Sequence, residues 1–352
     1  MNLLPKDSIE ILFGNNKITH MNKGSQNLYT DRHFKHRKGI YLDAARRYYD
    51  FDSLKAIIDI LHDTRQAELF LHFSSNEAFR VETSVFPNIP YQHYTKQQII
   101  ELCEYANKKN IMIIPVLTVP AHSGGWLDLL QAQDPIKYVE VVSDFDPTLV
   151  DYWDSAADGE PIKIIKELIT DLSETFSQPK FEGKQLFHLG MDEIAGATTN
   201  QTWLFWFMEH LINHVRWLNY KPVMWNDQVT QTFLDMAIDV NLGGKIAFTY
   251  WQQGVEGTVF PDDILENFEL YNANFYTQTF HAHNLSAANS VPYMLSNAKK
   301  NGFRTSNGIS ELSTVADVRG GLITIWAEGS EARTDQEIIT ELRIIFTEFL
   351  KI

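Results

Sequence analysis

Short apolar runs alternate with segments of helical periodicity along most of this 352-residue chain. The runs are almost continuously apolar, as expected for parallel strands that are buried on both faces. We expect strands at Gly39–Asp43, Glu68–Phe73, Ile111–Leu117, Gln185–Gly190, Pro222–Trp225, Lys245–Trp251, Phe268–Asn274 and Gly321–Trp326. Parallel neighbours need crossover connections, which are usually helices.

The segments between the runs carry the periodicity and the end signals of helices. In Pro161–Phe176 the apolar residues recur every three or four positions and form one stripe. Thr95 with Gln98, and Thr334 with Glu337, have the spacing of a capping box, in which side chains satisfy free amides of the first turn. The predicted helices are Asp52–His62, Thr95–Lys109, Pro161–Phe176, Thr202–Leu218, Val291–Asn301 and Thr334–Leu350.

Strands and helices in this order predict a single α/β domain, a (β/α)8 barrel of the TIM type, over residues 38–352. A doubly wound sheet is the alternative, but no glycine-rich phosphate turn follows an early strand. Residues 1–37 precede the first strand, and we expect them to form an N-terminal extra arm. The stretch Ser143–Glu160 is acidic and loop-like, so we expect it to shape the mouth of the barrel.

Charge and cysteine content exclude several function classes. The formal net charge of −15 argues against nucleic acid or an anionic membrane as the partner, because both need clustered lysine and arginine. The one basic cluster, Arg32–Lys38, is interpreted as a solvated lead-in segment. Cys103 is the single cysteine, so we expect neither an intramolecular disulfide nor a cysteine metal site.

Membrane and secretion signals are missing from the sequence. No stretch approaches the ~18 apolar residues of a membrane span. The N-terminus lacks a basic region followed by a long apolar run, so we expect no secretory signal in this chain. A cytoplasmic protein and the mature form of a secreted protein both remain open, and so does the oligomeric state.

Carboxylates and aromatic side chains gather at the predicted carboxyl ends of the strands, where barrel enzymes carry their chemistry. The fourth strand ends at Asp192 and Glu193. A shared site pushes two pKa values apart, so we expect one of these groups to stay charged while the other holds a proton near neutral pH. An Asp-Glu pair alone is more often a surface loop. The other ends supply Asp43 with Arg46, Trp225 with Asn226 and Asp227, Tyr250 with Trp251, Asn274 with Tyr276, and Trp326 with Glu328.

This repeated placement of tryptophans, tyrosines and carboxylates favours a carbohydrate site, since the C–H faces of pyranose rings stack on flat side chains. The motifs run in one order from about residue 38 to the C-terminus: GIYLDAARRYY, LHFSSNEAF, PAHSGGW, QPKFEGKQLFHLGMDE, PVMWND, TYWQ, ELYNANFY and LITIWAE. In these motifs the chain resembles the family 20 glycoside hydrolases, and among them the single-domain dispersin type.

The resemblance implies a retaining β-N-acetylhexosaminidase in which the substrate's own 2-acetamido oxygen is the nucleophile. It implies Glu193 as general acid and then base, Asp192 as the partner of the acetamido N–H, and Tyr276 as a donor to the acetamido oxygen. For substrate binding it implies Trp225, Trp251 and Trp326 as walls, Arg46 and Glu328 as partners of ring hydroxyls, Asp227 as a support, and His122 and His188 beside the acid, where a structural role is equally open.

The resemblance also implies the partner, which is an amino-sugar glycan. Exo-action and cleavage of poly-β-1,6-linked N-acetylglucosamine are both open, as is the choice among N-acetylglucosamine, N-acetylgalactosamine and a modified sugar. No metal and no cofactor are expected, and the chain has no metal-ligand spacing such as HExxH.

The chain departs from the family pattern around the sugar pocket. Ser75, Val116 and Thr118 stand where the family has acidic residues, while Met191 and Ala327 replace glycines. We expect the lost acids to leave Arg46 less neutralised, which favours a galacto-configured or anionic N-acetylhexosamine. The second possibility is weakened catalysis.

Two rival functions follow from these observations. A glycan-binding protein that keeps the pocket without turnover is favoured by the altered residues and disfavoured by the retained Asp192, Glu193 and Tyr276. A Schiff-base aldolase on the same fold would need a lysine at a strand end, and none stands at the ends named above.

Overall fold

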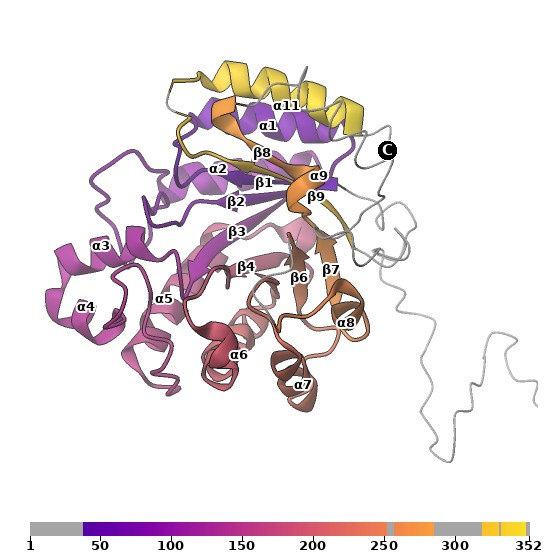
Figure 1. The fold of residues 1–352 in the computed structure, drawn as a ribbon. Coiled ribbons are helices and arrows are strands. Elements are labelled where there is room, and N and C mark those ends of the chain that lie inside the picture. Colours follow the sequence, from indigo (N-terminus) through magenta and orange to yellow (C-terminus); the bar gives the residue numbers. More distant parts are fainter. Residues whose placement is uncertain (1–37, 252–256, 285–318, 331, 350–352) are drawn as a thin grey trace, which may run out of the picture.

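The computed structural model describes residues 38–251, 257–284, 319–330 and 332–349. Its parallel strands are β1 (Lys38–Asp43), β2 (Glu68–His72), β3 (Met112–Val119), β4 (Leu186–Gly190), β5 (Lys221–Trp225), β6 (Ala247–Tyr250), β7 (Glu269–Asn272) and β9 (Gly320–Trp326). They pair in chain order, and β9 returns to pair with β1 (Figure 1). The predicted closed (β/α)8 barrel is confirmed.

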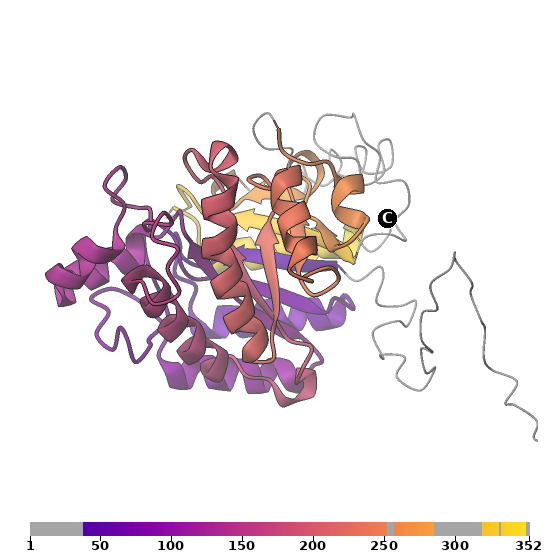
Figure 2. The same cartoon turned by 90° about the horizontal axis from the view of Figure 1, so that it is seen from below.

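Helices cover the outside of the barrel (Figures 1 and 2). They are α1 (Phe51–Asp63), α2 (Lys96–Lys108), α3 (Gly124–Gln133), α4 (Pro135–Val141), α5 (Glu160–Thr175), α6 (Gln201–Trp217), α7 (Gln231–Asp239), α8 (Pro261–Leu265), α9 (Phe275–Gln278) and α11 (Asp335–Phe349). Both predicted capping boxes form. The Gln98 side chain accepts the Thr95 backbone N–H at 2.9 Å, and Glu337 accepts that of Thr334 at 2.7 Å.

Some elements differ from the sequence prediction. The short helices α3, α4, α7, α8 and α9 escaped it, while the predicted arm 1–37 and the helix Val291–Asn301 lie outside the described residues. No helix in the described ranges is long and apolar enough to cross a membrane.

The predicted strand Phe268–Asn274 is shorter than expected and is continued by a second strand. Strand β7 stops at Asn272, whose side-chain oxygen accepts the backbone N–H of Asn274 at 3.0 Å, a local turn that competes with the strand ladder. After α9, strand β8 (Thr279–His281) pairs with the later half of β9, with Thr279 opposite Thr324. The seventh position of the barrel is therefore split around α9.

The strands divide the apolar core into two layers. Successive side chains on a strand point to opposite faces, so Tyr41 points into the barrel while Ile40 and Leu42 pack toward the helices. The interior is filled by rings and aliphatic side chains such as Phe70, Ile114 and Tyr271. A packed interior leaves the carboxyl-end mouth of the strands as the place for a site, as in other barrels of this type.

Candidate active site

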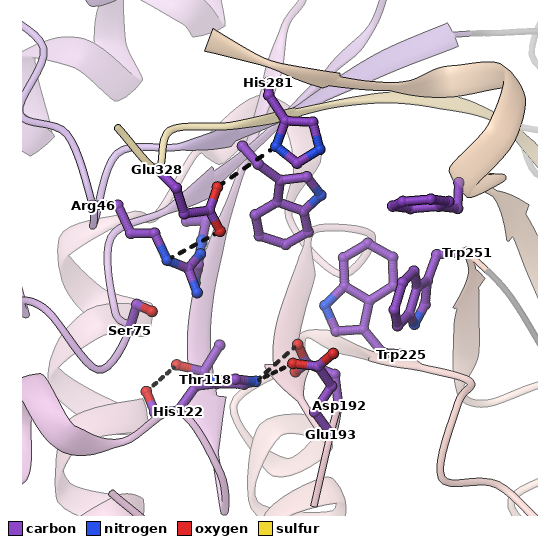
Figure 3. A pocket seen from close by; sticks show the side chains of 13 residues that line it. Arg46, Ser75, Thr118, His122, Asp192, Glu193, Trp225, Trp251, His281 and Glu328 are labelled. Carbon is purple, nitrogen blue, oxygen red and sulfur yellow. Dashed lines mark hydrogen bonds and ion pairs between the residues drawn. The ribbon is translucent and has the colours of Figure 1, made fainter. Parts of the chain in front are cut away.

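A pocket with a cavity of about 170 Å³ opens at the carboxyl ends of the strands (Figure 3). It is lined by Arg46, His72, Ser75, Thr118, His122, Asp192, Glu193, Trp225, Trp251, Phe275, His281, Trp326 and Glu328. Most of the predicted site residues therefore meet in one place. The cavity is smaller than the ~300–1,000 Å³ typical of pockets for drug-sized ligands, which suits one sugar ring better than a long chain.

The turn after β4 brings both neighbouring carboxylates into this pocket. Gly190, Met191 and Glu193 have left-handed backbones, with φ of 69°, 72° and 50°. A Cβ on Gly190 would lie 2.8 Å from the Thr118 Cα, so only glycine fits there. Met191 is not a glycine, and its left-handed backbone costs about 1–2 kcal/mol. This turn overcomes the alternation of a strand and lets Asp192 and Glu193 share one mouth.

His122 bridges the carboxylates. Its Nε2 lies 3.2 Å from Glu193 Oε2 and 3.7 Å from Asp192 Oδ2 (Figure 3). Behind them, Asp227 Oδ2 accepts the backbone N–H of Glu193 at 2.9 Å, which fixes the segment. Asp192 Oδ1 is buried and has no hydrogen-bond partner among the described residues. Asp192 lines the pocket, so this oxygen is an acceptor for which the described residues supply no donor.

The pKa values of the acidic residues in the site differ from those that the sequence predicted. A hydrogen bond from His122 lowers the pKa of Glu193, whose side chain is 59% exposed. The prediction that the shared site raises the pKa of the acid is therefore wrong for Glu193, because this group faces a histidine. Burial, reinforced by the charge of Asp192, instead raises the pKa of Asp227 to about 6.

Burial of His122 disfavours its charged form. The hydrogen bond to Glu193 and the charges of Asp192 and Glu193 outweigh that effect and raise the pKa of His122 to about 9. Asn76, which the sequence analysis did not single out, also touches this ring: its Nδ2 lies 3.3 Å from His122 Nδ1, and its Oδ1 accepts the backbone N–H of Gly124 at 3.2 Å. Asn76 follows Ser75, one of the positions at which the sequence departs from the pattern that the resemblance implies. That departure was the sequence signal that could have pointed to Asn76.

Arg46 lies on the opposite side of the pocket among three carboxylates. Its guanidinium is 3.2 Å from Asp43, 3.2 Å from Glu77 and 3.4 Å from Glu328, and its Cζ lies 5.6 Å from the centre of the Trp326 ring. The expectation that Arg46 is less neutralised is therefore wrong. The preference for an anionic or galacto-configured sugar was argued from that expectation, so it no longer has support. Asp43, Glu77 and Glu328 neutralise the charge of Arg46.

The three positions that lack family acids have different surroundings. Val116 packs inside the barrel with other apolar side chains. Thr118 lines the pocket and donates its hydroxyl to the Ser74 carbonyl at 2.6 Å. Ser75 lines it as well, and its hydroxyl is buried without a hydrogen-bond partner in the described ranges.

Aromatic rings from three strand ends form the remaining wall. The Trp225 ring centre lies 6.3 Å from that of Trp326 and 5.0 Å from that of Tyr41. The Trp251 ring packs 5.9 Å from Phe275 at the start of α9. Such flat apolar walls with few polar groups suit the C–H face of a sugar. Sequence reasoning missed Phe275, His72 and His281 in this lining.

Among the predicted site residues in the described part of the chain, His188 and Asp227 do not line the pocket. His188 is buried, its Nδ1 accepts the Gly190 N–H at 3.0 Å, and its Nε2–H donates to Thr249 Oγ1 at 3.0 Å. Burial holds the pKa of His188 well below its usual value, so this neutral ring has a structural role. Tyr276 belongs to α9, but its side chain lies outside the described part of the chain. No cluster able to hold a metal ion occurs among the described residues.

Known proteins share this chain's sequence pattern and fold. The model of the family "Glycosyl hydrolase family 20, catalytic domain" matches residues 34–339. A chitooligosaccharidolytic β-N-acetylglucosaminidase of Bombyx mori is 27% identical over 180 residues, which are 47% of this chain and 28% of that protein. β-Hexosaminidase 1 of Arabidopsis thaliana is 24% identical over 165 residues, 45% of this chain and 27% of that protein. The chain thus matches well under half the length of these relatives.

Among solved structures, dispersin B superposes with a TM-score of 0.77 at 19% identity, covering 90% of this chain and 98% of that one. A pneumococcal exo-β-D-N-acetylglucosaminidase with tandem catalytic modules gives a TM-score of 0.69 at 19% identity, covering 90% of this chain and 84% of that one. At such identities the likeness concerns the fold, a barrel without further domains in the first case.

Proposed function

The chain belongs to glycosyl hydrolase family 20, and from this premise we propose that it is a retaining β-N-acetylhexosaminidase that removes β-linked N-acetylhexosamine from a glycan. N-Acetylglucosamine is the favoured sugar, because the neutralised Arg46 gives no reason for an anionic one. The proposal assigns the chemistry to Asp192 and Glu193 and uses neither a metal nor a cofactor.

The observation that carries the proposal is the buried Asp192 Oδ1 without a partner among the described residues, next to a wall of indoles. A buried carboxylate oxygen that lacks a donor costs free energy, about 1–3 kcal/mol, and an amide N–H of the ligand would relieve that cost. The 2-acetamido group supplies such an N–H together with a methyl group that fits an aromatic wall.

The reaction then proceeds in two steps. The acetamido carbonyl oxygen attacks C1 and forms a C–O bond, while the bond from C1 to the leaving oxygen breaks and that oxygen takes the proton of Glu193. Asp192 balances the positive charge that develops on the acetamido nitrogen of the oxazolinium ion. Water next adds to C1, the C1–acetamido oxygen bond breaks, and Glu193 takes the water's proton, so the configuration at C1 is retained.

Glu193 has to hold a proton before the first step, although its hydrogen bond with His122 favours the ionised form. A bound glycan covers this exposed side chain and removes water, which disfavours the carboxylate. Asp227 anchors the Glu193 backbone, and Tyr276 is assigned as the donor to the acetamido oxygen on family pattern alone.

Substituted substrates test the mechanism directly. We would measure kcat for aryl β-glucosaminides that carry N-acetyl, N-fluoroacetyl and N-trifluoroacetyl groups, in that order of decreasing carbonyl nucleophilicity. Substrate assistance predicts a steep fall along the series. A rate that is indifferent to fluorination would contradict the oxazolinium step, because a protein nucleophile would then do the work.

A glycan-binding protein is the second candidate, favoured by the ionised state of Glu193 in its pair with His122. Calorimetry with N-acetylglucosamine oligomers distinguishes the two functions. Tight binding without release of sugar would support the binding protein, and turnover that Glu193→Gln abolishes would support the enzyme.

A further inference from the structure

Exposed tryptophans lie together outside the pocket. The ring centres of Trp153 and Trp203 are 6.2 Å apart at an interplanar angle of 52°, and the two residues are 36% and 48% exposed. Indoles carry large apolar surfaces that normally bury on folding, so adjoining exposed ones indicate a surface that meets a ligand.

This pair is tied to the segment that bears Glu193. Trp203 lies in the first turn of α6, which follows β4, and Trp153 lies in the loop before α5. Tyr152 stacks on Trp153 with ring centres 5.2 Å apart, and its hydroxyl donates to the carbonyl of Ala195 at 3.3 Å, two residues after Glu193. Since helices that follow barrel strands start at the carboxyl end, both indoles belong to the face that carries the pocket.

The position of the pair matches the path of the leaving group. The cavity suits one sugar ring, so the rest of a glycan has to lie outside it. The acid that protonates the departing oxygen has to sit on the side of that departing chain, which is the side of Glu193. We propose that Trp153 and Trp203 form a platform that stacks the leaving-group sugars of a β-linked N-acetylglucosamine oligomer. This proposal rests on the proposed function.

Two alanine variants and a matched control test the platform. Trp217 is 76% exposed at the opposite end of the same helix α6 and serves as the control. For Trp153→Ala and Trp203→Ala we expect the ratio of kcat/KM on the β-1,4 or β-1,6 tetramer to that on the 4-nitrophenyl glycoside to fall about fivefold to tenfold, as loss of one stacked ring predicts. Trp217→Ala should leave the ratio unchanged.

Binding separates failure of the platform from failure of the enzyme. If the wild-type protein hydrolyses nothing, the proposed function fails, and calorimetry with both tetramers still tests the platform: Kd should rise about fivefold to tenfold in the two variants and stay constant in Trp217→Ala. An equal effect in all three variants, no effect in any, or a change of oligomeric mass in Trp203→Ala would overturn the proposal, the last by showing a protein-protein surface.

A second inference comes independently from the amide of Asn76. A backbone N–H can only donate, so the Gly124 N–H fixes Asn76 Oδ1 as its acceptor and turns the Nδ2 hydrogens toward His122 Nδ1. In the neutral ring, His122 Nδ1 therefore accepts from Asn76 and the proton is on Nε2. A doubly protonated ring would set a second N–H against the amide hydrogens, donor against donor.

The charged groups around His122 oppose one another. Asp192 and Glu193, beyond β4, favour the imidazolium, whereas Arg46, beyond β1, disfavours it. We infer that Asn76 is a positioning residue that fixes the tautomer of the neutral His122 ring, with its proton on Nε2 directed at Glu193, and that opposes the second proton which the two carboxylates favour. An Nε2–H that donates to Glu193 holds this carboxyl group in position for its roles as acid and base.

Asn76→Asp exchanges the donor for an acceptor with little change of shape. A titration followed by imidazole ¹⁵N NMR, assigned with His122→Gln, should show the proton of the neutral ring on Nε2 in the wild type and a higher pKa of His122 in the variant. We expect the plateau of kcat to fall about tenfold while its alkaline limb moves to higher pH, because the aspartate stabilises the protonated pair. A misfolded site would lower the plateau without that displacement.

The NMR result stands whether or not the protein turns over substrate. A neutral wild-type ring with its proton on Nδ1, or a variant with an unchanged pKa of His122 and an unchanged alkaline limb, would refute the role of Asn76.

Discussion

The two sides of the pocket differ in how their charged groups are paired. On the Arg46 side every charge has partners: Asp43 accepts the backbone N–H groups of Ala45, Arg46 and Ala327 at 3.1–3.2 Å and pairs with the Arg46 guanidinium. On the Glu193 side, within the described ranges, Asp192 Oδ1 is buried and unpartnered and the Asp227 carboxylate is costly to ionise.

Backbone strain follows the same division. His122, Met191 and Glu193 are non-glycine residues with φ of 53°, 72° and 50°, and all three belong to the Glu193 side. Left-handed backbones at such residues persist only where the surroundings enforce them, and they gather at functional sites. The ion pairs of the Arg46 side give the pocket its shape and stability, whereas the strained Glu193 side is arranged for what binds there. Variants of each side should therefore fail in different assays.

The largest expected effect is on catalysis, at Glu193. Glu193→Gln should lower kcat by about 10²–10⁴-fold, as loss of a general acid and base does. The loss should be smaller for a 4-nitrophenyl glycoside than for a methyl glycoside, because nitrophenolate leaves without much help from an acid. Stopped assays on both substrates, with a urea melt as control, check this; equal losses on both would exclude Glu193 as the acid.

The next effect is on stability, at the Arg46 side. Asp43→Asn should lower the free energy of unfolding by about 3 kcal/mol, because it leaves the guanidinium without a buried partner. Burial opposes ionisation of Asp43, but His72 and Arg46 lower its pKa. This stabilisation is therefore complete above the unfolded-state pKa of about 3.9 and is lost as the pH falls below it.

Urea unfolding of Asp43→Asn and the wild type at pH 7 and at pH 3 measures that difference. The gap should be full at pH 7 and narrower at pH 3. A gap that stays constant with pH would mean that the substitution acts through packing and not through the charge.

The smallest expected effect is a gain in stability, produced by a substitution of Asp227. Its folded-state pKa of about 6 lies above the unfolded value, so ionisation near neutral pH destabilises the fold. Asp227→Asn keeps an acceptor for the Glu193 N–H and should stabilise the protein by about 1–2 kcal/mol above pH 6, with no gain below pH 4.

The same variant should lower kcat, because the charge beside Asp192 changes. Unfolding curves at pH 4 and pH 7.5 with parallel rate measurements test both parts. Destabilisation at pH 7.5 would show that the Asp227 charge contributes to the fold instead of opposing it.

The sequence predicted the barrel and most of the residues that line the pocket. Alternation of apolar runs with helical stripes predicted the barrel, since strands buried on both faces need continuous apolar sequence. Strand ends then indicated where Asp192, Glu193 and the tryptophans would meet, because all parallel strands end at one face. The break at Asn272 was missed because it depends on a single side-chain hydrogen bond and not on periodicity. The short helices, such as α9 with four residues and α3 with ten, were missed because they give too short a periodic pattern.

What the sequence determined by itself was therefore the architecture and the set of groups at its mouth. Only the tertiary structure decided which of these groups touch: Arg46 with Glu77 and Glu328, Glu193 with His122, and Asn76 with His122. Periodicity is a local property of the chain that survives without its partners. Ion pairing and proton affinity depend on distances of a few ångströms between residues far apart in sequence, and those distances exist only once the barrel has closed.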